Sequence, residues 1–281
     1  MSIRTDLAVE AHELTRGEAQ EIDGVTVDRT EHDGITKVVV EITNENGAKQ
    51  LGKRQGRYVT IEAPGIKYEL DDYERVCLML ADELRRMCKS TRVLVAGLGN
   101  RDITPDALGA EAVSQLIVTS HIKNKLPDAL DEDYGIVSAI APGVMGTTGI
   151  ETSEIIRGVA EKVRPEAIIA IDALAGADIN RICSVVQISD AGISPGSGVG
   201  NNRAGINRES FGVPVIAIGV PTVIAAELLT GSELPTEFEP LMVTTKDIDL
   251  VIKRMSKTVA NGINMAMHRN LTFKDIERIV D

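Results

Sequence analysis

Two short apolar runs that each lead to an aspartate form the strongest pattern in the sequence. Residues 93–96 (Val-Leu-Val-Ala) precede a loop that reaches Asp106, and residues 168–171 (Ile-Ile-Ala-Ile) run directly into Asp172. Runs of four to five aliphatic residues bounded by turn signals are typical of buried strands in a parallel sheet. The functional crevice of an open α/β sheet lies outside the carboxyl ends of its strands. We therefore expect both carboxylates near one edge of one sheet.

Strands and helical periods alternate through the rest of the chain. Strands are predicted over residues 36–42, 57–61, 136–141, 184–189 and 213–220, with a turn at 44–47 between the first two. Helices are predicted over 71–87, after Thr104, over 151–163, over 247–268 and from a cap at Thr272 with Asp275. This order predicts an α/β fold, with a mixed or mostly parallel sheet flanked by helices and a small N-terminal β subdomain.

The composition agrees with this fold and excludes some functions. The 281 residues are 43% hydrophobic but only 2% aromatic, so the core is built from Val, Ile, Leu and Ala. A net charge of −12 disfavours direct binding to nucleic acid or to an anionic membrane. The three cysteines form no C-x-x-C pair and are expected to be reduced and buried in a cytoplasmic protein. The chain shows no signal peptide and no run of 18 apolar residues, so we expect no membrane span.

Each aspartate has an ordinary structural explanation beside a functional one. Asp106 would lie in the first turn of the helix that Thr104 caps, where the helix dipole favours a carboxylate by roughly 0.3–1 kcal/mol. Asp172 is harder to explain in this way, because a carboxylate that ends an apolar strand is poorly solvated. Poorly solvated titratable groups are typical of functional sites. Two of them at one edge can divide the roles of general acid and general base.

Two glycine-containing motifs match known signatures only in part. The pair Gly97 and Gly99 follows a strand, but Asp102 stands where a dinucleotide fingerprint needs its third glycine. Residues 192–196 match G-x-S-x-G, but no helix follows directly, as a nucleophile elbow requires. The whole loop over 190–212 is glycine-rich and is either a long turn or a backbone that wraps around an extended ligand. The four histidines show no zinc-binding spacing.

Eight short motifs, in this order along the chain, resemble the spore germination protease family. They are Arg-Thr-Asp-Leu-Ala-Val-Glu-Ala from residue 4, Gly-Leu-Gly-Asn from 97, Thr-Pro-Asp-Ala-Leu-Gly from 104, Gly-Thr-Thr-Gly-Ile-Glu-Thr from 146, Ile-Asp-Ala-Leu-Ala from 171, Gln-Ile-Ser-Asp from 187, Pro-Gly-Ser-Gly-Val-Gly-Asn from 195 and Ile-Ala-Ile-Gly-Val-Pro-Thr-Val from 216. The resemblance spans residues 4 to about 265. Each motif alone is weakly specific, whereas their common order is highly specific.

The resemblance implies an endopeptidase of the spore core that degrades small acid-soluble spore proteins during germination. The family's mechanism is an atypical aspartic one, and its two key aspartates fall on Asp106 and Asp172. The implied fold is similar to that of hydrogenase maturation proteases, and the implied assembly is a homotetramer. No cofactor is expected. Those distant relatives bind a metal through acidic residues and a histidine, but this chain offers no obvious third ligand.

The family's members are made as zymogens, which predicts a processing site near the N-terminus. Residues 6–10 (Asp-Leu-Ala-Val-Glu) resemble the family's substrate motif, so we expect cleavage at or beside the Asp6–Leu7 bond. This division gives a propeptide over 1–6 and a single α/β protease domain over 7–281, with a β-hairpin appendage at about 35–61. Substrate contacts are expected at Asn100 and from the glycine-rich backbone, at Gly196, Ser197, Gly198 and Gly200. Two alternatives are a catalytically inactive relative that binds a protein partner in the same cleft and a metal-dependent hydrolase.

Overall fold

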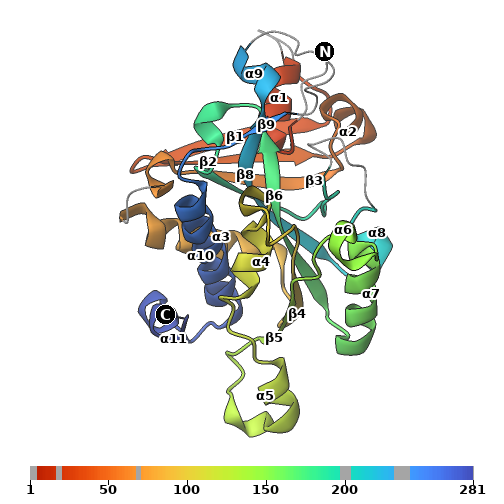
Figure 1. The fold of residues 1–281 in the computed structure, drawn as a ribbon, viewed down its shortest axis with the longest axis vertical. Helices are drawn as coiled ribbons and strands as arrows, with labels where there is room; N and C mark the ends of the chain where they lie inside the picture. The colour runs from red at the N-terminus through yellow and green to blue at the C-terminus, as the bar shows by residue number, and fades with distance from the viewer. Residues whose placement is uncertain (1–4, 17–20, 68–70, 197–203, 231–240, 281) are drawn as a thin grey trace.

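A nine-stranded mixed sheet forms the centre of the molecule (Figure 1). The computed structural model describes residues 5–16, 21–67, 71–196, 204–230 and 241–280. Within them the strand order is β1-β2-β3-β7-β8-β6-β4-β5, and β9 pairs with β8. The strands are β1 (Val25–His32), β2 (Ile35–Ile42), β3 (Gly56–Glu62), β4 (Arg92–Gly97), β5 (Ile136–Ile140), β6 (Ala167–Gly176), β7 (Val185–Ser189), β8 (Val215–Ala225) and β9 (Met242–Val243).

The sheet has a parallel half and an antiparallel half, which confirms the predicted α/β class. Strands β8, β6, β4 and β5 are parallel neighbours. Strands β1, β2, β3 and β7 are antiparallel, and β7 joins the two halves by pairing antiparallel to β8. The predicted strands over 36–42 and 57–61 are therefore part of the main sheet, because β3 pairs with β7. The predicted turn at 44–47 is wrong, because Asn44 caps a helix there by accepting a hydrogen bond from the Gly47 amide at 2.9 Å.

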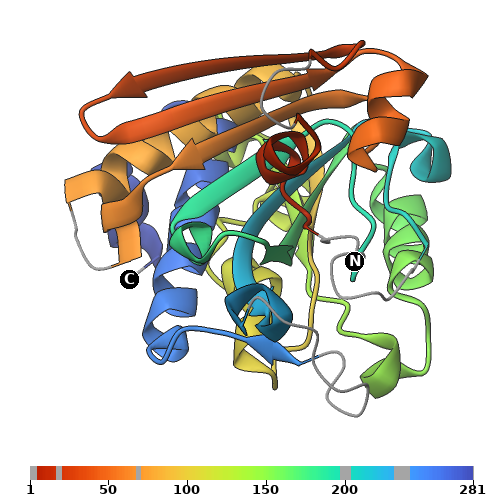
Figure 2. The same ribbon diagram turned by 90° about the horizontal axis from the view of Figure 1, so that it is seen from above.

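Helices cover both faces of the parallel half, as the continuous apolar strands predict. The helices are α1 (Ala8–Arg16), α2 (Glu45–Leu51), α3 (Asp71–Met87), α4 (Leu108–Val113), α5 (Ser120–Lys125), α6 (Met145–Thr148), α7 (Thr152–Val163), α8 (Arg208–Phe211), α9 (Ala226–Thr230), α10 (Ile248–Met267) and α11 (Phe273–Val280). Figure 2 shows α3 and α10 packed together on one side of the sheet and α7 on the other. No helix in the described part of the chain is long and apolar enough to cross a membrane.

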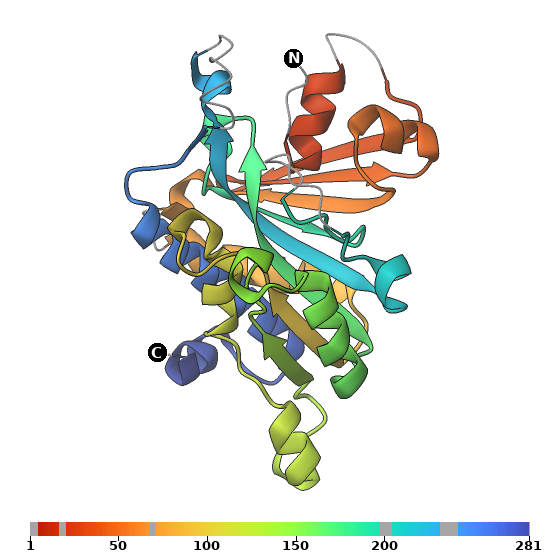
Figure 3. The same ribbon diagram turned by 45° about the vertical axis from the view of Figure 1, so that its right-hand side comes forward.

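The alternation of side chains along β6 divides the core into clusters on its two faces. Ile169 and Ile171 belong to the large cluster under α3, α4 and α10. Ile168 and Ala170, on the other face, belong to a cluster with α7. Farther along this second face, Leu174 belongs to a third cluster that includes α1 and strands β2 and β3. Figure 3 shows α1 and α7 at separate places along the sheet. Residue 172 therefore lies between the part of the face that α7 covers and the part that α1 covers.

Candidate active site

Asp172 lies in a row of residues that crosses three strands. It is paired with Gly219 of β8, and Gly219 is paired with Gln187 of β7. Paired residues of neighbouring strands project to the same face of a sheet, so the Asp172 and Gln187 side chains stand on either side of a glycine. A Cβ on Gly219 would lie 2.5 Å from Cδ1 of Leu174, so the packing of Leu174 requires a glycine at the middle position of this row.

The position of Asp172 differs from the sequence expectation in one respect. Strand β6 does not end at this aspartate but continues to Gly176. Its neighbour β4 ends instead, since the last pair between the two strands is Gly97 with Ile171. Asp172 is therefore the first residue of β6 beyond its pairing with β4, and it is buried, with 5% of its surface exposed.

The loop after β4 brings Asp106 to the same place. The Leu98 amide donates to the Ile171 carbonyl at 2.8 Å, which ties the start of the loop to the residue before Asp172. Gly99 then follows with φ +98°, and a Cβ there would lie 2.0 Å from the Asp106 carbonyl oxygen. The Asp106 carboxylate accepts a hydrogen bond from the Asn100 amide at 2.7 Å.

The local structure around Asp106 corrects the predicted helix start. Thr104–Asp106 is a single 3₁₀ turn, and α4 begins only at Leu108 and ends at Val113. The side chain of Thr104 does not cap this turn, since Ile103 occupies the cap position. Asp106 is thus held by the backbone of its own loop, through the Asn100 amide, rather than placed in the first turn of a long helix.

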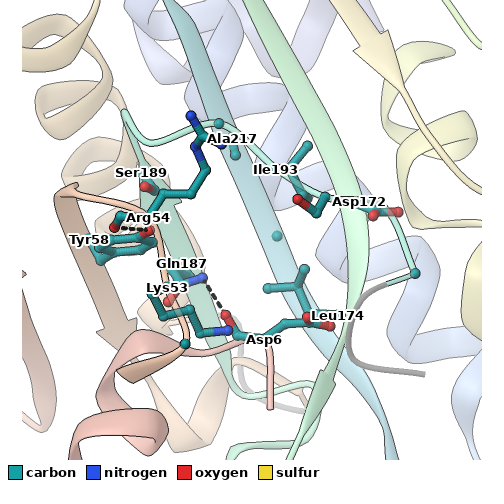
Figure 4. Close-up of a pocket in the computed structure, with 15 residues that line it drawn as sticks. Asp6, Lys53, Arg54, Tyr58, Asp172, Leu174, Gln187, Ser189, Ile193 and Ala217 are labelled. Atoms are coloured by element: carbon teal, nitrogen blue, oxygen red, sulfur yellow. Dashed lines mark hydrogen bonds between the residues drawn. The ribbon is translucent and has the colours of Figure 1, made fainter. Parts of the chain in front are cut away.

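Both aspartates line one pocket of about 390 Å³, together with Leu98, Gly99 and Pro105 from the loop. An adjoining pocket of about 290 Å³ is also lined by Asp172 and reaches to Lys53 and Gln187 (Figure 4). Asp6, Asp172, Leu174 and Gly196 line both cavities, so the two cavities lie side by side and are together called the cleft below.

The N-terminal segment of the protein forms part of the wall of this cleft. Asp6 lines both pockets. Its amide donates to the Ala175 carbonyl at 2.9 Å, and its carboxylate accepts from the Ala175 amide at 2.9 Å. A register shift between Leu174 and Ala175 interrupts the pairing of β6 with β8 at this point. The next residue, Leu7, is fully buried.

A single glutamine holds the chain on both sides of the Asp6–Leu7 peptide bond. The Gln187 side-chain Nε2 donates to the Asp6 carbonyl oxygen at 3.3 Å, and its Oε1 accepts from the Ala8 amide at 2.8 Å (Figure 4 shows the first bond). Gln187 begins one of the eight motifs but is not among the predicted site residues. The available signal was a polar residue within the otherwise apolar run of β7, but this signal does not indicate what the residue contacts.

Charged groups fix the segment on either side of this bond. Lys53 Nζ donates to the Thr5 carbonyl at 2.6 Å. Glu10 is buried, and its carboxylate accepts from the amides of Ala177 at 2.7 Å and Asp178 at 3.0 Å. Burial raises the pKa of Glu10, although hydrogen bonds from Thr5 and these amides act in the opposite direction. Burial lowers the pKa of Lys53, against the charges of Asp6 and Glu10.

The other predicted contact residues differ in where the structure places them. Gly196 lines both pockets. Asn100 shapes the loop, since its amide donates to Asp106 and its side chain accepts from the Asp102 amide at 3.0 Å. Ser197, Gly198 and Gly200 lie outside the described residues. Among the residues that the structure does describe, no group of three or more His, Cys, Asp or Glu side chains is placed to hold a metal ion.

The fold and the cleft define an α/β protein with two aspartates that line one pocket together with Asp6 of its own N-terminal segment. Residues 4–235 match the germination protease family. The protein is 42% identical over its whole length to a germination protease of Caldanaerobacter subterraneus subsp. tengcongensis, 98% of which is covered. It is 41% identical, again over its whole length, to one of Clostridium perfringens, 99% of which is covered. The chain therefore belongs to the germination protease family and is a peptidase.

Similarity extends to more distant proteins. A germination protease of Priestia megaterium is 38% identical over 96% of this chain and 95% of its own length. A solved structure of a [NiFe] hydrogenase maturation protease from Thermococcus kodakarensis aligns with 67% of this chain and 98% of its own, at 19% identity and a TM-score of 0.38.

Proposed function

We propose that the protein is an endopeptidase that hydrolyses small acid-soluble spore proteins during germination, with Asp106 and Asp172 as its catalytic pair. One observation carries this proposal: both aspartates line one pocket, and Asp6, the residue before the expected cleavage site, lines it with them. Membership of the germination protease family supports the biological setting. The same setting implies a homotetramer in the spore core.

The two aspartates differ in their surroundings, which supports a division of labour. Asp172 is buried on the face of the sheet, whereas Asp106 is partly exposed in a loop. In the proposed reaction the pair starts with one proton. The ionised aspartate accepts a proton from a water molecule as the oxygen attacks the carbonyl carbon, and the protonated aspartate gives its proton to the leaving amine as the C–N bond breaks. The water oxygen ends in the new carboxyl group, so atoms and protons balance without a cofactor.

The Asp6–Leu7 bond is the proposed site of self-processing, which would release residues 1–6. Three features support it: the residue before the bond is bound to Ala175, the residue after it is fully buried, and Asp6 lines both of the pockets that Asp172 lines. While the segment stays bound, it occupies the space that a substrate needs. Processing is therefore proposed as the step that opens the cleft.

The test is cleavage of a purified small acid-soluble spore protein by four proteins, each produced as the full chain and first taken through the mild acidification and drying that should allow self-processing. They are the wild type, Asp106→Asn, Asp172→Asn and Asp102→Asn, where the last changes an exposed aspartate of the same loop. Loss of a general acid or base costs typically about 10²–10⁴-fold, so the first two variants should fall by at least 10²-fold. The Asp102 variant should retain the wild-type rate.

Each protein is also assayed with a chelator, which tests the metal-dependent alternative. The aspartic mechanism predicts that the wild-type rate is unchanged by the chelator. Cleavage by both Asp106→Asn and Asp172→Asn at the wild-type rate would contradict the proposed pair. A wild-type protein that binds the spore protein but never cuts it would support an inactive, partner-binding relative instead.

A further inference from the structure

The two hydrogen bonds of Gln187 do different things for the bound segment. Ala8 is the first residue of α1, and the first amides of a helix have no acceptor within the helix. The hydrogen bond from the Ala8 amide to Gln187 Oε1 therefore caps the helix, which is an ordinary structural role. The hydrogen bond from Gln187 Nε2 to the Asp6 carbonyl oxygen does not cap the helix, because this carbonyl lies before it.

The Asp6 carbonyl is also the group on which a hydrolysis of this bond would develop negative charge. Attack by water turns the carbonyl oxygen into an oxyanion, and a donor placed beforehand at that oxygen stabilises the transition state. The distance from Gln187 Nε2 to the Asp6 oxygen is 3.3 Å, and bonds of this kind shorten as charge develops. Gln187 is 7% exposed, and such bonds are worth more where water is excluded.

The sheet register gives Gln187 a fixed relation to Asp172. Both residues are paired with Gly219, one from each side, and both project to the face on which Asp6 is bound. Gly219 carries no side chain, and the side chain of Leu174 packs over it, between the two residues. The carbonyl that Gln187 holds belongs to Asp6, which lines both of the pockets that Asp172 lines.

We propose that Gln187 is a further catalytic residue of this protein. Its Nε2–H bond stabilises the oxyanion of the residue before the cut, while its Oε1 holds the amide of the second residue after the cut. This inference rests on the proposed hydrolysis at Asp6–Leu7. Gln187 exchanges no proton: water adds to the Asp6 carbonyl carbon, the bond to the Leu7 nitrogen breaks, and the hydrogen bond of Gln187 follows the charge on the oxygen. A neutral amide provides one donor group and one acceptor at a single position, which neither a lysine nor a carboxylate does.

The experiment measures self-cleavage at Asp6–Leu7 in the full-length protein, by mass spectrometry of the new N-terminus after mild acidification and drying. Gln187→Glu keeps the length of the side chain and the acceptor for Ala8 but loses the donor. Gln50→Glu makes the same chemical change at an exposed position of α2 and is the matched control. Hydrogen exchange at the Ala175 amide, which donates to Asp6, reports whether the segment stays bound.

Removal of one oxyanion donor costs about 10²–10³-fold in rate. We expect Gln187→Glu to slow cleavage by that factor while protection of the Ala175 amide is kept, and Gln50→Glu to cleave within about twofold of wild type. Cleavage by Gln187→Glu at the wild-type rate, with the wild type dependent on Asp172, would overturn the role of Gln187 and leave the proposed function intact. A wild-type protein that cuts the spore protein but never cuts this bond would overturn both the role of Gln187 and the proposed self-processing.

A second measurement decides the matter if Gln187→Glu releases the segment. Replacement of Ala8 by its α-hydroxy acid changes the Leu7–Ala8 amide to an ester, which removes the N–H that Gln187 Oε1 accepts and leaves Gln187 itself intact. The proposal predicts cleavage at Asp6–Leu7 slowed by about tenfold, the value of one hydrogen bond. An unchanged rate would overturn the proposal that the two hydrogen bonds of Gln187 hold this peptide bond for cleavage.

Discussion

Gly99 connects the backbone of the β4 loop to the position of Asp106, so it offers a test of the site without a change to either aspartate. Gly99→Ala meets two costs. An L-residue at φ +98° is strained by about 1–2 kcal/mol. The added Cβ would also lie 2.0 Å from the Asp106 carbonyl oxygen, a backbone atom that moves only with the loop. Overpacking of this kind costs about 1–3 kcal/mol, for a total of about 2–5 kcal/mol.

Gly34→Ala is the matched control. Gly34 has φ +79°, and a Cβ on it would meet no atom within 4 Å, so only the backbone cost of about 1–2 kcal/mol applies. The assay pairs urea unfolding with the rate of substrate cleavage for both variants. A displacement of about 1 Å at a catalytic group costs about 10²-fold. We expect Gly99→Ala to lose activity on that scale and Gly34→Ala to keep it. Full activity in Gly99→Ala would refute the view that this loop must place Asp106.

Three further predictions concern buried charges. Arg181→Met should destabilise the fold by about 3–5 kcal/mol in urea unfolding, because Glu62, which Arg181 contacts at 2.9 Å, would lose a buried partner; an unchanged midpoint would contradict the ion pair's importance. The pKa of Glu10 is raised by burial, so the folded state holds the proton more tightly, and the free energy of unfolding should fall as pH rises above 4.5 through the folded pKa. Glu10→Gln should remove this dependence on pH, and a dependence that persists in the variant would refute its assignment to Glu10. The pKa of His268 is lowered by burial, so the contribution of the neutral imidazole to stability is complete above pH 6.5 and should be lost as pH falls through the folded pKa. His268→Gln should flatten that part of the plot of unfolding free energy against pH.

The parallel half of the sheet and the position of both aspartates could be predicted from the sequence. The run at 168–171 is apolar because both faces of β6 are covered, and this continuous pattern identifies a buried parallel strand. The loop after β4 returns to the same edge because the two strands are parallel neighbours. Asp106 and Asp172 could therefore be expected at one site, although the end of β6 could not be located. That strand continues to Gly176, beyond the point where its apolar run meets Asp172.

The antiparallel half and the bound segment could not be predicted in the same way. Strand β1 is exposed along almost its whole length, so burial imposes no alternation on its sequence. The helix at Glu45–Leu51 starts from an asparagine that also suits a turn. Gln187 and Asp6 are 181 residues apart, and only the assembled sheet brings them together. Local propensity contains no information about such a contact.

The most direct test of the central claim is the N-terminus of the protein after processing, compared between wild type and Asp172→Asn. The wild type should acquire a new N-terminus at Leu7, detected by mass spectrometry. Asp172→Asn should keep residues 1–6 at least 10²-fold longer under the same conditions. The same new N-terminus, formed at the same rate in both proteins, would contradict the claim that Asp172 hydrolyses the peptide bond bound in its cleft.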